Sequence, residues 1–174
     1  MKIISNESFE MLFKPVIEEL RDLSWLALPN SFEYPSAWLG QGYDKVSDSF
    51  VSGPIFEFEH ECPKICKDRN YFGHHLKPGV VSRFAAGVSN DWSTLMAMRE
   101  PVLDGLSLLE AYFSSPRREA FVEDRAAALI NSVDGLHWQV YIRDVELRER
   151  LHRHLASLKE PVVAEMPWPE AYVL

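Results

Sequence analysis

The stretch Asp134-Gly135-Leu136-His137-Trp138-Gln139-Val140-Tyr141-Ile142-Arg143-Asp144 decides the fold. Apolar and polar side chains alternate along residues 136–143, which is the period of a β-strand with one face on a core. The expected core face consists of Leu136, Trp138, Val140 and Ile142. The opposite face consists of His137, Gln139, Tyr141 and Arg143. We expect that face to be a secondary binding face, because tyrosine and arginine dominate interface hot spots.

A helix is expected directly after this strand. Asp144 can cap its first turn, and leucines then recur at a spacing that gives one apolar stripe. The stripe consists of Leu147, Leu151, Leu155 and Leu158. The basic residues of the other face are Arg148, Arg150, His152, Arg153 and His154. Glutamates are interleaved with them, which is typical of a solvated helix face with short-range ion pairs.

Upstream of residue 134 the pattern predicts both helices and strands. Residues 6–26 carry one apolar stripe and are expected to be helical, with a kink or a restart at Pro15. Residues 55–59 alternate like a strand, and 80–88 with 94–99 predict a hairpin. A helix is expected to start at Pro101, and another to run over 116–133 until Asp134-Gly135 ends it.

These elements predict an α+β fold in a single globular domain, residues 1–174. A small, mainly antiparallel sheet would pack with about four helices, because strands do not alternate regularly with helices. The expected organisation is an acidic N-terminal lobe at 1–61, a strand and helix core at 80–158 and an extended tail at 159–174. Residues 30–54 and 60–79 are expected to be ordered loops, since they are rich in turn-forming residues.

The charge of the chain is unevenly distributed. The formal net charge is −8, and residues 1–61 hold eleven acids against four bases, a net charge of −7. Residues 62–174 hold fifteen acids against fourteen bases, a net charge of −1. An acidic lobe attracts a basic partner over a long range, and it excludes direct binding of nucleic acid phosphates.

Several classes of protein are not expected. The first residues lack a secretory h-region, and no apolar run approaches the length that spans a bilayer. We therefore expect a cytoplasmic protein with no membrane partner. Catalytic fingerprints such as G-x-S-x-G, H-E-x-x-H and a phosphate-binding glycine loop are missing from the sequence, so neither an enzyme nor a cofactor is expected.

The acidic lobe supplies the candidate partner-binding residues. The electrostatic part is expected to consist of Asp44, Asp48, Glu57, Glu59 and Glu61. Like charges on one strand face repel one another, so the ladder at 57, 59 and 61 indicates that the charge has a use. Trp38 and Tyr43 are expected to be aromatic anchors.

A cluster of cysteine and histidine residues gives the alternative chemistry. It consists of His60, Cys62, Cys66, His74 and His75. Zinc takes such ligands, but the spacing is irregular, so we expect no bound metal. Reduced thiols are the simpler interpretation in a cytoplasmic protein. If the cluster were functional, it would make the chain a metal- or thiol-dependent hydrolase.

Residues 134–144 and the leucine-striped helix after them resemble the closing strand and helix of small immunity proteins from bacterial toxin–immunity systems. Those proteins are typically single, acidic, cytoplasmic α+β domains that bind and block a cognate toxin. The resemblance implies an inhibitor of a basic toxic effector and assigns no role to any single residue. The alternatives are the hydrolase and a structural or adaptor subunit of a larger assembly, and a homodimer is possible in either case.

Overall fold

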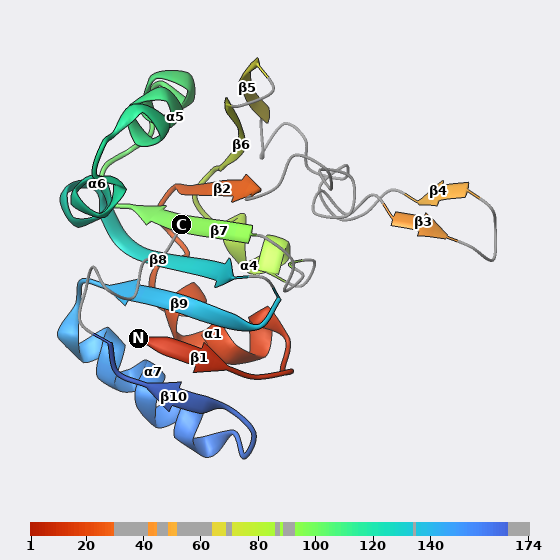
Figure 1. Cartoon of the computed structure of the whole chain (residues 1–174), viewed down its shortest axis with the longest axis vertical. Helices are drawn as coiled ribbons and strands as arrows, with labels where there is room; N and C mark the ends of the chain where they lie inside the picture. Colours follow the sequence, from red (N-terminus) through yellow and green to blue (C-terminus); the bar gives the residue numbers. More distant parts are fainter. Residues whose placement is uncertain are drawn as a thin grey trace.

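The computed structural model describes residues 1–29, 42–44, 49–51, 64–68, 71–85, 88, 93–133 and 135–166. Its elements run through the chain in a mixed order of helices and strands (Figure 1). They are β1 (Lys2–Ile4), α1 (Phe9–Glu19), β2 (Trp25–Pro29), β3 (Gly42–Asp44), β4 (Ser49–Val51), β5 (Lys64–Asp68), β6 (Tyr71–Leu76), α4 (Val81–Phe84), β7 (Ser93–Met98), α5 (Gly105–Ser114), α6 (Arg118–Arg125), β8 (Ala126–Val133), β9 (His137–Ile142), α7 (Val145–Ser157) and β10 (Val162–Ala164).

The centre of the fold is an eight-stranded sheet with the order β10-β1-β9-β8-β7-β2-β6-β5. Every neighbouring pair in it is antiparallel. Among the described residues, strands β3 and β4 pair with each other in a separate two-stranded sheet. The predicted α+β class with an antiparallel sheet is thus confirmed, although the sheet is larger than the small one expected.

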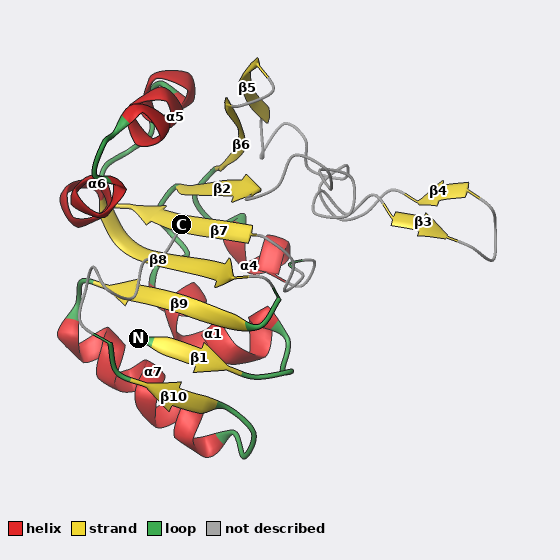
Figure 2. Ribbon diagram, viewed as in Figure 1, coloured by secondary structure: helices red, strands yellow, loops and turns green. Residues whose placement is uncertain are grey.

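Residues 137–142 form β9 and residues 145–157 form α7, as expected. Trp138, Val140 and Ile142 are buried on one face of β9, whereas Leu136 precedes the strand and is 70% exposed. The Asp144 carboxylate accepts a hydrogen bond of 2.8 Å from the Leu147 amide and so caps α7. Helices α1 and α7 lie behind this part of the sheet, and α5 and α6 lie near its other end (Figure 2). The leucine stripe of α7 faces the same core.

Helix α1 passes through Pro15 without ending there. A proline lacks the amide that would donate to the carbonyl four residues earlier, which here belongs to Met11. The His154 ring on α7 donates a 2.7 Å hydrogen bond from Nε2 to that carbonyl instead. The partner helix thus satisfies the group that the proline leaves open. The predicted helix over 6–26 is too long, because α1 ends at Glu19 and residues 25–29 form β2.

A further prediction about a helix is wrong. Residues 116–133 were expected to be one helix, but α6 ends at Arg125 and residues 126–133 form the central strand β8. Ala128 and Ile130 face the core under α1 and α7, while Leu129 faces the core under α5 and α6. Residues 126–130 are apolar toward both faces of the sheet, so they lack the alternation that would identify a strand. Gly135, with φ of 65°, turns the chain from β8 into β9.

The remaining differences concern both the type and the ends of elements. The loop predicted over 60–79 is wrong in part, because it contains β5 and β6. Residues 81–84, expected in a strand, form the short helix α4. Its Val81 and Phe84 are both buried in the core under α1 and α7. Helix α5 starts at Gly105 and not at Pro101, because the Asp104 carboxylate accepts hydrogen bonds from the amides of Leu106 and Ser107. In the tail, Val162–Ala164 forms β10 against β1. The strand predicted at 55–59 lies outside the described residues.

Candidate functional site

The structure describes only part of the predicted acidic binding region. Tyr43 and Asp44 lie in β3 and pair in register with Phe50 and Ser49 of β4. The other predicted partner-binding residues are Trp38, Asp48, Glu57, Glu59 and Glu61, and they lie outside the described residues. Their role in binding therefore stays a prediction.

Three of the acids of the first third that the structure describes have basic neighbours. Glu18 lies 3.9 Å from Lys14, and Asp22 lies 3.6 Å from Arg21. Glu19 accepts a 2.7 Å hydrogen bond from Arg150 of α7, which raises the pKa of that guanidinium. Residues 1–29 hold five acids and three bases, whereas 30–61 hold six acids and one base. The unbalanced charge of the acidic lobe is thus concentrated in residues 30–61.

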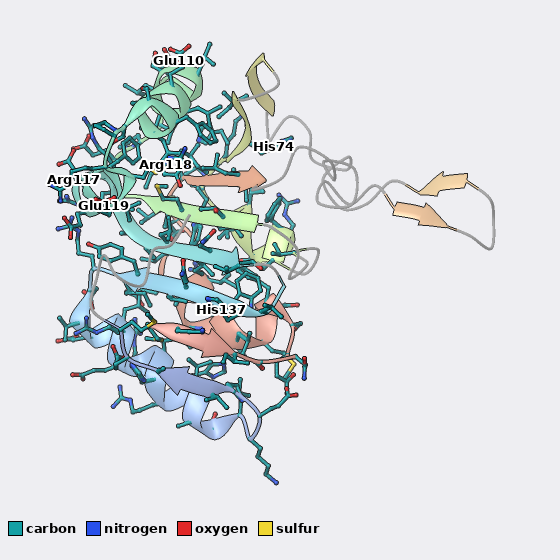
Figure 3. All side chains as sticks on the ribbon, viewed as in Figure 1. His74, Glu110, Arg117, Arg118, Glu119 and His137 are labelled. Atoms are coloured by element: carbon teal, nitrogen blue, oxygen red, sulfur yellow. The ribbon has the colours of Figure 1, made fainter. Side chains whose placement is uncertain are left out.

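The polar row on β9 is less open than expected. Gln139 is 3% exposed, His137 and Tyr141 are half-buried, and Arg143 is exposed (Figure 3 labels His137). The Arg143 Nε–H donates to the Ala126 carbonyl over 3.4 Å, so this side chain is held against β8. Tyr141 packs against the core under α5 and α6. Of the row, only Arg143 is exposed, so it keeps the most accessible position for a partner.

Gln139 belongs to a buried polar ladder that crosses three strands. The Thr94 hydroxyl of β7 donates a 2.6 Å hydrogen bond to the Asn131 side-chain oxygen of β8. The Asn131 amide in turn donates to the Gln139 side-chain oxygen over 3.3 Å. All three side chains are at most 3% exposed. Because buried polar groups need partners, the ladder fixes the register of these strands.

The predicted metal ligands do not come together in the described part of the chain. His74 and His75 are consecutive in β6, so their side chains point to opposite faces of the sheet and cannot share one ion. His74 is 4% exposed and pairs in register with Ala27 and Lys64. Cys66 lies in β5 opposite Phe72, while His60 and Cys62 lie outside the described residues. Within the described ranges no group of three or more potential ligands gathers around a point.

The His75 ring is half-buried, and its Nε2 has no hydrogen-bond partner among the described groups. Burial lowers the pKa of His75 below the ordinary value of 6.5, and the positive charge of Lys77 lowers it further. The folded chain thus favours the neutral ring, and the unfolded chain takes up the proton first as pH falls.

We expect the free energy of unfolding to decrease as pH falls below about 6.5, where His75 is protonated in the unfolded chain. The stabilisation from the neutral His75 ring is fully present above about pH 6.5, and it is lost as pH falls through the lowered pKa of His75 in the folded chain. His75→Gln should make the pH dependence shallower in this window. Urea unfolding of both proteins at several pH values measures it. Parallel curves for the two proteins would contradict the assignment.

No family model, curated protein or solved structure matches this chain. In the described part of the chain, no helix combines the length and the apolar character needed to cross a membrane. A proposal about the function therefore rests on the charge, the burial and the geometry of the chain's own residues.

Proposed function

We propose that this protein binds and neutralises a basic toxic protein, as an immunity protein does for its cognate toxin. The observation that carries the proposal is the uneven charge: a net −5 in residues 30–61, against −1 in all of 62–174. In this proposal the chain acts as an inhibitor in the cytoplasm, and it needs no catalytic group or cofactor of its own.

Electrostatics favours a protein partner with a basic active surface. Unpaired acids in one part of a chain raise the local concentration of a basic partner and speed its association. A nuclease toxin carries a basic face for phosphates, so an acidic inhibitor matches the surface that has to be occluded. Several described acids of α1 and its C-terminal turn already have basic neighbours, so they contribute little to this field. The residues expected to carry the attraction are those of 30–61.

Neutralisation can be tested in growing cells. The proposal predicts that a neighbouring gene encodes the toxin, and that its product stops growth when expressed alone. Co-expression of this chain should restore growth. A variant with Asp44→Asn, Asp48→Asn, Glu57→Gln and Glu59→Gln should protect less, because four of the attracting charges are gone.

A matched control removes the same charge from the balanced part of the chain. Glu100, Glu123, Glu146 and Glu149 are all exposed, and replacing them by Gln changes the net charge equally. This control should protect like the wild type. Failure of the wild-type chain to restore growth would contradict the proposed function, and equal loss in both variants would contradict the role of 30–61.

A further inference from the structure

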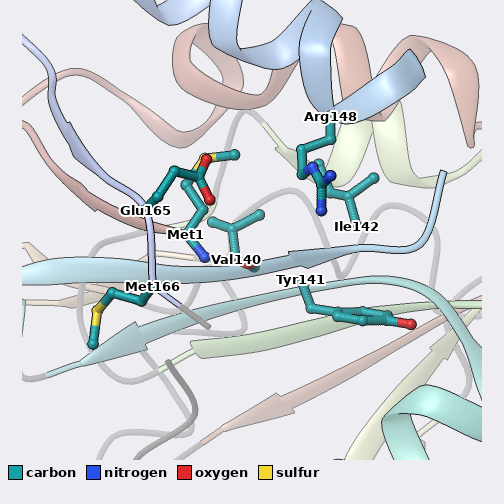
Figure 4. Close-up of a pocket in the computed structure, with 7 residues that line it drawn as sticks. All are labelled: Met1, Val140, Tyr141, Ile142, Arg148, Glu165 and Met166. Carbon is teal, nitrogen blue, oxygen red and sulfur yellow. Dashed lines mark hydrogen bonds between the residues drawn. The ribbon is translucent and has the colours of Figure 1, made fainter. Parts of the chain in front are cut away.

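A cavity of about 370 Å³ lies between β9, α7, the first residue and the segment after β10 (Figure 4). Its lining residues are Met1, Val140, Tyr141, Ile142, Arg148, Glu165 and Met166. Tyr141 contributes through its backbone, since its ring leaves on the other side of the strand (Figure 4). The volume is at the lower end of the range for small-molecule sites.

The floor of the cavity is apolar. Val140 and Ile142 are 3% and 4% exposed, and Met1 is 5% exposed. Met166 lies on the side of the cavity that carries Glu165 (Figure 4). The side chains of Val140, Ile142 and Met1 are already almost fully buried, so an apolar body placed against them displaces little water, and the charged groups of the cavity set its preference for a ligand.

Arg148 and Glu165 stand on opposite sides of this floor (Figure 4). Glu165 is already engaged, because its Oε1 accepts a hydrogen bond from the His152 ring. The ammonium of Met1 donates to the Val140 carbonyl over 3.0 Å. Burial lowers the pKa of that ammonium, the nearby Glu165 charge raises it, and the Arg148 charge lowers it. The Glu165 carboxylate thus already has a hydrogen-bond donor in the His152 ring and a nearby cation in the Met1 ammonium.

Arg148 differs from Glu165 in this respect. The ion pairs of α7 within the described residues are those of Arg150 with Glu19 and of His152 with Glu165. Arg148 forms no ion pair with a described carboxylate. A guanidinium at the rim of an apolar cavity offers a fork of donors that fits a carboxylate in two parallel hydrogen bonds.

We propose that this cavity binds a small organic anion, a carboxylate on a short apolar body. The carboxylate pairs with the guanidinium of Arg148, and the hydrocarbon part covers Val140 and Ile142. A cation of the same shape is disfavoured, because Arg148 and the Met1 ammonium repel it and Glu165 is already hydrogen-bonded. The inference rests on the cavity alone and is independent of the proposed partner.

Isothermal titration calorimetry with three matched probes tests this inference. The probes are 4-methylpentanoate, 4-methylpentanamide and 4-methylpentylamine, which share one apolar body. We expect the carboxylate to bind most tightly. Arg148→Gln should weaken its binding at least about tenfold, the range of a lost charge-assisted hydrogen bond.

Two further variants sharpen the result. Arg153→Gln, on an exposed position of the same helix and outside the cavity lining, should bind the carboxylate like the wild type. Arg148→Glu should invert the preference towards the amine, while circular dichroism confirms that the helix is retained. Absence of carboxylate binding, equal binding of the three probes or unchanged binding by Arg148→Gln would each overturn the proposal.

Discussion

Replacing Trp138 by alanine is expected to lower the free energy of unfolding by about 3–5 kcal/mol. Trp138 is 1% exposed, and its ring centroid lies 5.4 Å from those of both Phe9 and Phe13. Its removal leaves a cavity between β9 and α1 that neither rigid element can close. Urea denaturation followed by far-ultraviolet circular dichroism gives the number.

Tyr141→Ala is the comparison on the other face of the same strand. Tyr141 is half-buried against the core under α5 and α6. Its replacement should therefore lower the free energy of unfolding measurably, but clearly less than the replacement of Trp138. The sequence alone predicts that the face of Tyr141 is open and that its replacement changes the free energy of unfolding little. Because Tyr141 packs against a core, we expect a larger decrease than the sequence predicts. Equal losses for the two variants would contradict the assignment of Trp138 to the main core.

Asn131→Leu is expected to lower the free energy of unfolding by about 2–3 kcal/mol. Leucine has the same branching and the same number of side-chain heavy atoms as asparagine, but it is bulkier and offers no hydrogen bond to Thr94 or to Gln139. Both partners keep other contacts, so the loss stays below that of two fully orphaned groups. Chemical denaturation measures the change, and Thr94→Val alone should cost less.

A double-mutant cycle separates the ladder from the volume change. If the hydrogen bond between Thr94 and Asn131 carries the effect, Asn131→Leu should cost less in the Thr94→Val background than in the wild type. Strictly additive losses would show that the two residues act independently, and that the ladder does not hold β7 to β8.

The sequence predicts elements well where a single period is present. Strand β9 and helix α7 each have one apolar and one polar face, so alternation and a leucine stripe identify them. Residues 126–130 of β8 are apolar on both faces, and their alanines and leucine are strong helix formers, so local propensity points to the wrong element. The prediction for residues 81–84, which form the short helix α4, is wrong for another reason. Four residues are too few to establish a period.

The candidate sites differ in the same way. Charge is a property of composition, so the excess of acids in 30–61 is visible without any structure. The cavity cannot be predicted from the sequence in this way. Val140, Arg148 and Glu165 come from β9, α7 and the segment after β10, which only tertiary packing brings together. Arg148 resembles any solvated arginine of a helix until β9 and the segment after β10 are placed beside it.

Association kinetics at two ionic strengths test the central claim, that the acidic region steers a basic partner. The partner in this measurement is the proposed basic toxin, and the variant carries the four neutralising changes at Asp44, Asp48, Glu57 and Glu59. We expect slower association of this variant at low salt, and a smaller effect of added salt on it than on the wild type. The control with changes at Glu100, Glu123, Glu146 and Glu149 should associate like the wild type. Association of the neutralised variant at the wild-type rate in low salt would contradict the account.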